Sequence, residues 1–375
     1  MPAAGPIPLT IVTGFLGSGK TTLLNRLLRQ PGLAGTVVIV NEFGEIGLDH
    51  LLIETSDERF ALLDNGCVCC TVRDDLATTL ADLDRRAAAG HPPRLDRVIL
   101  ETTGLADPAP ILHTLMIEPA LARSFRIDGV VATIDAVNGA GTLDRHAEAA
   151  KQAAVADRLL LTKTDLADEA TVATLRRRLR AINPAADIVA VRDGAAATSH
   201  VLETGRQDAD RPGALAAWLR TAEAAASAHH ADSCADPACG HGHAHHHHAE
   251  SRHDDGIGTF AFTVVEPLEW ESFARWLDYL MTLRGEDLLR FKGIVAVTDD
   301  PERPMVVHGV QHVMHPPLRL DAWPEADSDR RTRLVFIVRD IERALIERTF
   351  AKFAGRTPDS PQTAAIARDR VAAPL

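Results

Sequence analysis

The chain has 375 residues, of which 46% are hydrophobic and 4% aromatic, and its formal net charge at pH 7 is −12. This length predicts two or three domains, and the negative charge argues against a protein that binds nucleic acids or membrane surfaces in general. Residues Met1 to Pro8 lack the basic and apolar regions of a signal peptide and no apolar run approaches the ~18 residues of a membrane span, so we expect a cytoplasmic protein with no membrane partner.

The first predicted elements are a buried strand over residues 7–13, a glycine-rich loop over residues 14–21 and a helix over residues 22–28. The loop fits G-x-x-x-x-G-K-[ST], the phosphate-binding loop, in the strand–loop–helix context that this motif requires. We expect Lys20 to contact the β and γ phosphates and Thr21 to bind Mg²⁺. The other residues of this loop predicted to bind the nucleotide are Gly14, Gly17, Ser18, Gly19 and Thr22.

Strand-like and helix-like segments alternate through residues 1–225, which we predict to be one domain. The strand candidates are 7–13, 36–40, 97–100, 129–134, 158–161 and 187–191, and the helical patterns include 73–88, 143–156 and 168–181. Such alternation predicts an α/β domain whose mostly parallel sheet is covered by helices on both faces. Ligands then bind at the carboxyl ends of the strands, where the remaining motifs are expected.

Acidic residues follow three of these strands. Glu42 lies in residues 41–47, which predict either a mobile loop near the nucleotide or an ordinary polar turn. Glu101 ends the strand 97–100, where P-loop proteins place a second carboxylate that organises Mg²⁺, although any buried strand can end in an acid. Three residues on, Gly104 can offer its N–H to the γ-phosphate. Asp135 has no supporting neighbours and is predicted to be a cap or turn residue.

The strand 158–161 is followed by Thr162, Lys163, Thr164 and Asp165, which resemble the guanine-reading [NT]-K-x-D element of GTPases. The Asp165 carboxylate can accept hydrogen bonds from guanine N1–H and the 2-amino group, which adenine lacks. Thr162 stands where many GTPases have Asn. The alternative is a strand-to-helix turn capped by Asp165.

Three of the five cysteines, Cys67, Cys69 and Cys70, lie within four positions beside an Asn-Gly turn. Thiolates are soft ligands suited to Zn²⁺, Co²⁺ or Cu⁺. Buried structural cysteines and a redox disulfide are the two alternatives.

Residues 226–256 are poor in apolar side chains and predict a flexible linker. Nine of the seventeen histidines and two cysteines lie in it, and clustered imidazoles and thiols suit Zn²⁺, Ni²⁺ and Co²⁺; a polar spacer is the alternative. The candidate secondary metal ligands are His229, His230, Cys234, Cys239, His241, His243, His245, His246, His247 and His248.

Residues 257–355 predict a smaller α/β domain with helices on a largely antiparallel sheet. We expect strands over 259–265, 287–297, 305–313 and 332–338, and helices over 268–283 and 340–353. The aromatic residues of the first helix are interpreted as core, and His308, His312 and His315 as structural histidines rather than metal ligands. Residues 356–375 predict a disordered tail.

Together, these motifs resemble the CobW-type family of P-loop GTPases, relatives of the UreG and HypB nickel-insertion GTPases. The resemblance rests on residues 14–22, 41–44, 66–70, 101–108 and 162–165, and on the linker and the closing domain. It implies a P-loop GTPase that delivers zinc or cobalt to a client metalloprotein. It also implies metal-site thiols at Cys67, Cys69 and Cys70, with Glu42 as an oxygen ligand or switch residue.

The sequence therefore predicts a GTP-hydrolysing metallochaperone that uses GTP, Mg²⁺ and Zn²⁺ or Co²⁺, with Lys20, Thr21 and Glu101 as the residues that act on the phosphates. A nucleotide-gated metal buffer or sensor and a P-loop small-molecule kinase are the alternatives. The oligomeric state is left open, a homo-oligomer included.

Overall fold

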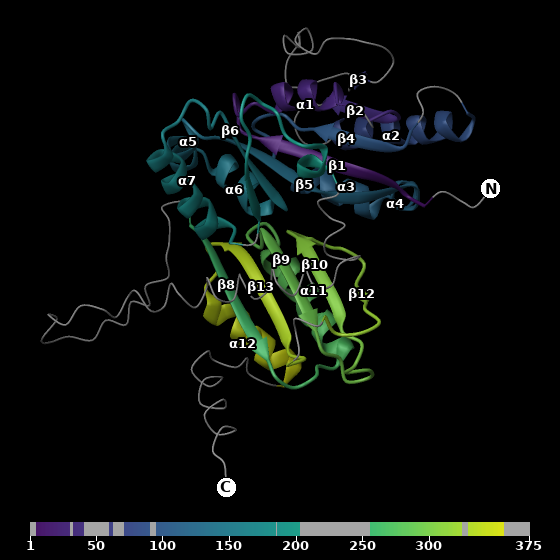
Figure 1. Ribbon diagram of the computed structural model, residues 1–375. Helices are drawn as coiled ribbons and strands as arrows, with labels where there is room; N and C mark the ends of the chain where they lie inside the picture. The colour runs from purple at the N-terminus through teal and green to yellow at the C-terminus, as the bar shows by residue number, and fades with distance from the viewer. Residues whose placement is uncertain are drawn as a thin grey trace, which may run out of the picture. The chain divides into compact units, whose positions relative to one another are not determined.

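The structure is a computed structural model that describes residues 5–30, 33–40, 60–62, 71–90, 95–184, 186–202, 256–324 and 329–355. Within these ranges the chain forms two compact units (Figure 1). The first holds the described residues up to 202 except 181–184, and the second holds those four residues and the described residues from 256 on. No helix in these ranges is long and apolar enough to cross a membrane.

A seven-stranded sheet forms the centre of the first unit, with the strand order β3-β2-β4-β1-β5-β6-β7. Every pair of neighbouring strands is parallel, which confirms the predicted α/β class. The strands are β1 (Ile7–Gly14), β2 (Thr36–Val40), β3 (Phe60–Leu62), β4 (Arg97–Glu101), β5 (Phe125–Asp135), β6 (Arg158–Thr162) and β7 (Asp187–Ala190).

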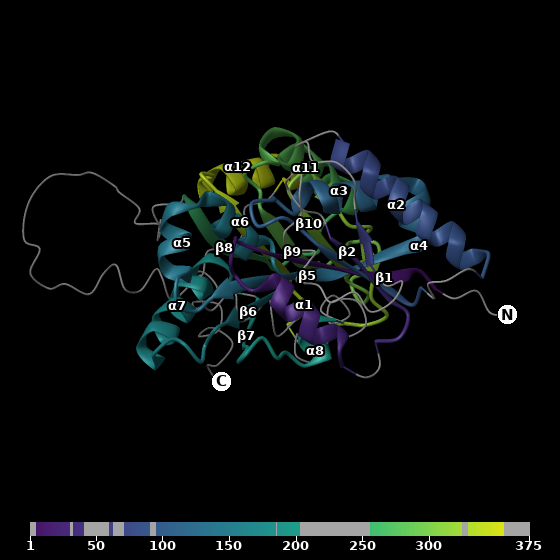
Figure 2. The ribbon, with the colours of Figure 1, turned by 90° about the horizontal axis from the view of Figure 1, so that it is seen from above.

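Helices cover both faces of this sheet, as the fully buried apolar runs of β2 and β6 require. Figure 2 shows α1 and α8 on one side of the sheet and α2, α3 and α6 on the other. The helices are α1 (Lys20–Leu28), α2 (Thr71–Ala88), α3 (Ala109–Ile117), α4 (Pro119–Ser124), α5 (Gly139–Arg145), α6 (Ala147–Val155), α7 (Glu169–Ile182) and α8 (Thr198–Val201). A core of Val12, Leu23, Leu24, Ile99 and Val131 joins α1 to the sheet.

The strand register gathers the predicted site residues at one edge of the sheet. Glu101, at the end of β4, is the register partner of Val12 in β1 and of Val40 in β2. Asp135, at the end of β5, is the register partner of Thr162 at the end of β6. The phosphate loop that follows β1 therefore lies between the ends of β4 and β5.

The prediction of one continuous helix over residues 143–156 was wrong, because the chain breaks at His146 between α5 and α6. His146 ends α5 and begins α6 with an extended backbone, φ −133° and ψ 106°. Its N–H donates to Thr142 O while its carbonyl accepts from Ala149 N, so it caps both helices. Its ring stacks on Phe15 of the phosphate loop, with centroids 4.4 Å apart. A contact with a residue so distant in sequence is invisible to helical periodicity.

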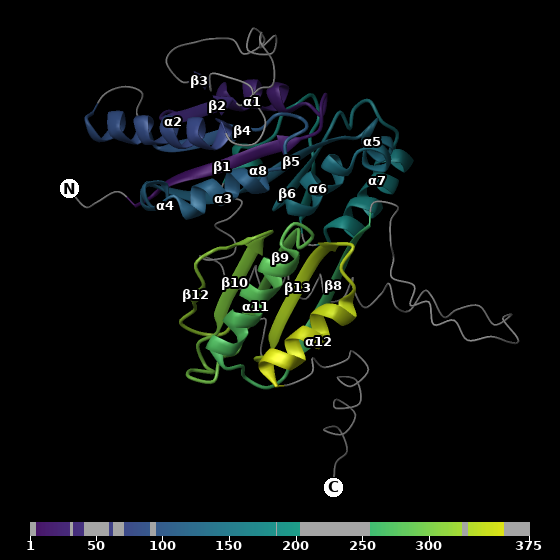
Figure 3. The same ribbon diagram turned by 180° about the vertical axis from the view of Figure 1, so that it is seen from behind.

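The second unit contains an antiparallel sheet in the order β11-β10-β9-β13-β8, with β12 paired to β10. Figure 3 shows α11 (Trp270–Arg284) and α12 (Arg343–Ala354) on one face of it. The strands are β8 (Ile257–Val264), β9 (Arg290–Val295), β10 (Met305–Val310), β11 (Val313–Met314), β12 (Leu318–Arg319) and β13 (Thr332–Arg339).

The aromatic side chains predicted as core in α11 lie in or against the core: Phe273 and Trp276 are buried, and Trp270 packs against them partly buried. Trp276 is fully buried, lies edge-on to Phe350 of α12 at a centroid distance of 5.0 Å, and donates its indole N–H to Thr349 Oγ1. The single strand predicted over residues 305–313 is instead β10 and β11, because Gln311, at φ 52°, turns the chain back on itself.

Candidate functional site

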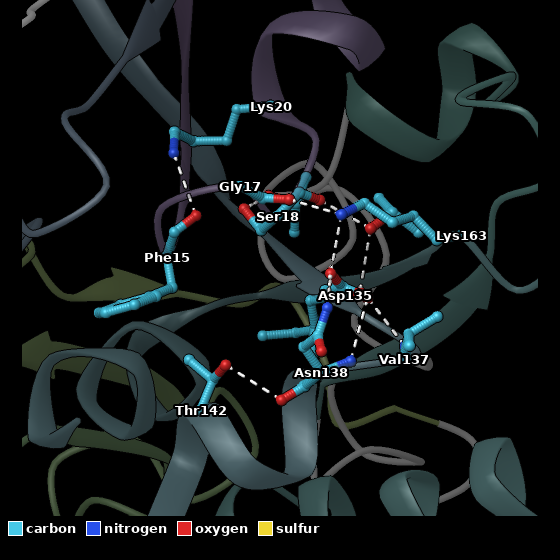
Figure 4. A network of polar contacts seen from close by, with 12 residues as sticks. Phe15, Gly17, Ser18, Lys20, Asp135, Val137, Asn138, Thr142 and Lys163 are labelled. Atoms are coloured by element: carbon cyan, nitrogen blue, oxygen red, sulfur yellow. Dashed lines mark hydrogen bonds and ion pairs between the residues drawn. The ribbon is translucent and has the colours of Figure 1, made fainter. Parts of the chain in front are cut away.

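The phosphate loop has the conformation that its glycines predict. Gly14 has a φ of 138°, and a Cβ on it would lie 2.3 Å from Thr133 Oγ1 and 2.5 Å from Thr133 O, so no side chain fits there. Gly17 and Gly19 also have positive φ. Lys20 begins α1, and its ammonium group donates to Gly14 O at 2.8 Å and to Phe15 O (Figure 4). Thr21 and Thr22 continue the same helical turn.

Thr21 and Glu101 meet at the end of β4. The Thr21 hydroxyl donates to Glu101 Oε1 at 3.1 Å, and the Glu101 side chain is only 4% exposed. A hydroxyl and a carboxylate oxygen form a hard donor set beside the phosphate loop, which fits Mg²⁺. The structure thus brings together two of the three residues that we predict to act on the phosphates, with Lys20 on the same helical turn as Thr21.

The loop after β4 lies against the phosphate loop. A Cβ on Gly104 would lie 2.7 Å from the backbone nitrogen of Leu16 and 2.5 Å from its Cδ2, so only glycine allows this approach. Ala106 N donates to Thr103 O, which closes a turn over residues 103–106. The N–H groups of Gly104 and Leu105 donate to no described carbonyl. The loop can therefore offer them to an anion.

Thr162 fastens the end of β6 to the phosphate loop. Its hydroxyl lies 2.6 Å from Ser18 O and 3.2 Å from Ile134 O, and both carbonyls can accept from it. The Ser18 hydroxyl in turn shares a hydrogen bond of 2.6 Å with Thr133 Oγ1. Thr162 thus provides a polar tether between the end of β6 and the phosphate loop.

Lys163 lies across the phosphate loop with a left-handed backbone, φ 56°. Its ammonium group donates to Gly17 O and to Asp135 Oδ2, both at 2.8 Å (Figure 4). These contacts hold the Lys163 stem beside the loop, where it can cover one face of a bound base.

Asp135 does more than the predicted cap. Its Oδ1 accepts from the N–H groups of Val137 and Asn138 at 2.8 and 3.2 Å, which confirms the capping role. Its Oδ2 binds Lys163, which sequence reasoning missed. Burial works to raise the pKa of this carboxyl, but the hydrogen bonds from Lys163, Asn138 and Val137 together outweigh it, and the pKa lies below its usual value. The contact between Asp135 and Lys163 follows from the strand order, because β5 and β6 are neighbours and their ends lie side by side.

Asp165 lies beside a tight turn that sequence reasoning also missed. Asp193 and Gly194 have φ of 50° and 67°, as in a type I′ turn, and Asp193 N donates to Asp165 Oδ1 at 3.3 Å. The Thr164 hydroxyl donates to Val191 O just before that turn. The Asp-Gly pair is a strong turn signal, and the turn lies against Asp165, the residue predicted to read the base.

The predicted ligands of the transition metal lie outside the described residues, unlike Thr21, the predicted Mg²⁺ ligand. They are Glu42, Cys67, Cys69, Cys70 and the linker set His229, His230, Cys234, Cys239, His241, His243, His245, His246, His247 and His248. The predicted linker and tail are likewise outside the described ranges. Within those ranges no group of three or more His, Cys, Asp or Glu residues could hold a metal ion.

The three histidines of the second unit do not form such a group. His312 Nδ1 lies 3.0 Å from Met281 O and is satisfied by it. His308 and His315 place their rings side by side with centroids 3.9 Å apart.

Two family models match the two units of the chain. Residues 8–190 match the CobW/HypB/UreG nucleotide-binding domain, and residues 257–354 match the cobalamin synthesis protein cobW C-terminal domain.

One relative matches most of the chain, and another matches about half of it. The zinc chaperone YjiA of Escherichia coli K12 is 30% identical over 92% of this chain and 98% of its own. The zinc-regulated GTPase metalloprotein activator 1 of Schizosaccharomyces pombe is 36% identical over 49% of this chain and 45% of its own. The solved structure of Zn(II)-bound YjiA GTPase from E. coli covers 93% of this chain and 99% of its own, with a TM-score of 0.66 and 26% identity.

Proposed function

The chain belongs to the CobW/HypB/UreG family of P-loop GTPases, and on that premise we propose that it is a zinc chaperone that uses GTP hydrolysis to control zinc binding and transfer to a client metalloprotein. The observation that carries the nucleotide half of the proposal is the tether of Thr162 and Lys163 to the phosphate loop. The names of the full-length and half-length relatives support zinc as the metal.

The nucleotide site can select and hold GTP with its own residues. Asp165 accepts from guanine N1–H and the 2-amino group, and Lys163 covers the base. Thr21 and Glu101 would hold Mg²⁺, which when bound neutralises charge on the phosphate oxygens. Lys20 already lies against the loop carbonyls and has only to extend toward the phosphates.

The proposed zinc ligands are the thiols of Cys67, Cys69 and Cys70, with Glu42 as a further ligand or switch residue. Strand β2 ends at Val40 and its parallel neighbour β3 ends at Leu62. The segments that carry Glu42 and the cysteines therefore begin at adjacent strand ends, on the same edge as the phosphate loop. This placement supports a metal site that responds to the nucleotide. The His- and Cys-rich residues 229–253 are proposed as a capture arm.

In this proposal, GTP and zinc must change each other's binding affinity by the same factor. If GTP tightens zinc binding, zinc tightens GTP binding by the same factor, and such couplings are typically ~1–3 kcal/mol. Hydrolysis removes the γ-phosphate contacts, and the zinc affinity falls to that of the GDP state. Thiolates and imidazoles also accept Co²⁺, so the cell's metal supply decides between these ions.

Titration of zinc into the full chain with GDP and with a non-hydrolysable GTP analogue tests the proposal. We expect tighter binding with the analogue, and loss of the tight site in a Cys67→Ser, Cys69→Ser, Cys70→Ser variant. Deletion of residues 229–253 should lower the number of zinc ions bound while keeping the tight site. Equal zinc affinities in both nucleotide states would refute the coupling.

A further inference from the structure

One buried side chain of α6 holds the loop after β4. Gln152 is 1% exposed, and its Nε2 donates to Gly104 O at 3.2 Å and to Ala106 O at 2.9 Å. Its Oε1 is buried and accepts from no donor among the described residues. A buried amide without a second partner is costly, so its position is explained by the two carbonyls that it binds.

The neighbouring residue of α6 holds the same loop at a third point. Lys151 Nζ lies 3.3 Å from Asp107 Oδ2, and both side chains are about three-quarters buried. Asp107 Oδ1 accepts from Ala109 N at the start of α3. Two consecutive residues of one helix therefore fix the loop at Gly104, Ala106 and Asp107.

These contacts orient the N–H groups of the loop. In a trans peptide the N–H of one residue points opposite to the carbonyl of the residue before it. Gln152 binds Gly104 O, so the Leu105 N–H points away from α6. Thr103 O faces inward to accept from Ala106 N, so the Gly104 N–H points out of the turn. Gln152 thus maintains a loop beside Leu16 of the phosphate loop whose Gly104 and Leu105 N–H groups donate to no carbonyl in the described part of the chain.

The other end of α6 touches the phosphate loop itself. His146, the N-cap residue of α6, stacks on Phe15. The capped helix therefore contacts two loops, the phosphate loop through His146 and the 104–107 loop through Lys151 and Gln152.

We propose that Gln152 is a positioning residue for GTP: from α6 it holds the 104–107 loop in the conformation that receives the γ-phosphate, so that GTP is bound and hydrolysed while GDP binding does not depend on it. Lys151 acts in the same way through Asp107. The inference rests on the GTPase part of the proposed function and is independent of the metal part.

The test uses the full chain and compares Gln152→Leu with wild type. Leu keeps most of the side-chain volume and removes the amide donor. We expect the affinity for a non-hydrolysable GTP analogue and the single-turnover rate of GTP hydrolysis each to fall roughly tenfold, as one or two lost hydrogen bonds predict, with GDP affinity unchanged.

Gln30→Leu is the matched control. Gln30 Nε2 donates to Ala196 O at 2.7 Å and its Oε1 accepts from Thr198 Oγ1, so this substitution removes a similar amide far from residues 104–107 in the chain. It should leave the ratio of GTP-analogue affinity to GDP affinity unchanged.

An unchanged ratio in Gln152→Leu, or the same change in Gln30→Leu, would overturn the positioning role. If Gln152→Leu does not fold, Lys151→Ala must lower the ratio in the same direction, and its failure to do so would equally overturn it. A wild-type chain that binds no GTP refutes the proposed function itself, so the two failures are distinguishable.

Discussion

The hydroxyl of Thr162 lies 2.6 Å from the carbonyl oxygen of Ser18, and it joins the segment predicted to read guanine to the phosphate loop across 144 residues of sequence. Many GTPases have Asn at this position, and Thr162 departs from that pattern. The contact shows that a hydroxyl can fasten the two loops together, so the departure leaves the tether intact.

Removal of this hydroxyl should weaken the binding of every nucleotide. Thr162→Val keeps the shape of the side chain but leaves two buried carbonyls without this donor, at a cost of about 1–3 kcal/mol. We expect the Kd values for GDP and for a GTP analogue to rise together, about fivefold or more. Thr162→Ser, which retains a hydroxyl, should bind more tightly than the Val variant. Unchanged affinities in Thr162→Val would show that the tether does not serve nucleotide binding.

A methyl group on Gly104 should slow GTP hydrolysis without changing the affinity for GDP. It would meet the backbone nitrogen of Leu16 at 2.7 Å, and the loop after β4 must move to relieve the contact. Gly104→Ala should slow single-turnover hydrolysis at least tenfold while the Kd for GDP stays near the wild-type value. Gly141→Ala is the control, because a Cβ there meets only the Arg145 side chain, at 3.5 Å or more. Wild-type hydrolysis in Gly104→Ala would mean that the loop does not receive the γ-phosphate.

Base selection should follow the carboxylate of Asp165. Asp165→Asn places an amide against guanine N1–H and the 2-amino group, and the loss of two charged hydrogen bonds predicts a GTP affinity about 100-fold lower. The variant should gain affinity for xanthosine triphosphate, which carries a carbonyl oxygen in place of the 2-amino group. Competition of each nucleotide against fluorescent GDP measures both effects. Equal binding of ATP and GTP by wild type would contradict guanine reading.

The ion pair between Asp135 and Lys163 predicts a specific pH dependence. The pKa of Asp135 is lower in the folded chain, so the pair contributes fully above the ordinary carboxyl pKa of about 3.9 and is lost as pH falls through the lowered value. Asp135→Asn should lower the free energy of unfolding by about 1 kcal/mol, and that difference should be constant from pH 8 to pH 5.

Urea unfolding of both proteins at pH 7, 5 and 3 measures this difference. It should narrow at pH 3, because the Asp135 carboxyl takes up a proton there in the unfolded chain more readily than in the folded one. If the difference in unfolding free energy grows as the pH falls, the Asp135–Lys163 ion pair is not its cause.

The parts of the site that sequence predicts are those close to a strand end. Glu101 ends a strand and the phosphate loop and Asp165 closely follow one, and a parallel sheet brings such ends together. Their chemistry is therefore visible once the alternation of strands and helices is recognised.

The missed parts depend on partners that are distant in sequence. Lys163 contacts Asp135 across 28 residues of sequence, and this contact depends on the strand order. Gln152 contacts Gly104 across 48 residues, and this contact depends on the packing of α6. The break between α5 and α6 falls at His146, whose ring stacks on Phe15, 131 residues earlier in the chain. The predicted domain boundaries at residues 225, 256 and 355 lie beside or within ranges that the structure does not describe, and they stay predictions.

Zinc release during a single turnover tests the central claim most directly. The full chain is loaded with zinc and GTP–Mg²⁺, and phosphate release and zinc capture by a chromogenic chelator are followed together. We predict that zinc leaves at the rate of hydrolysis, and that a non-hydrolysable GTP analogue retains it. Zinc loss at the same rate with the analogue as with GTP would contradict the account, because zinc release would then not depend on GTP hydrolysis.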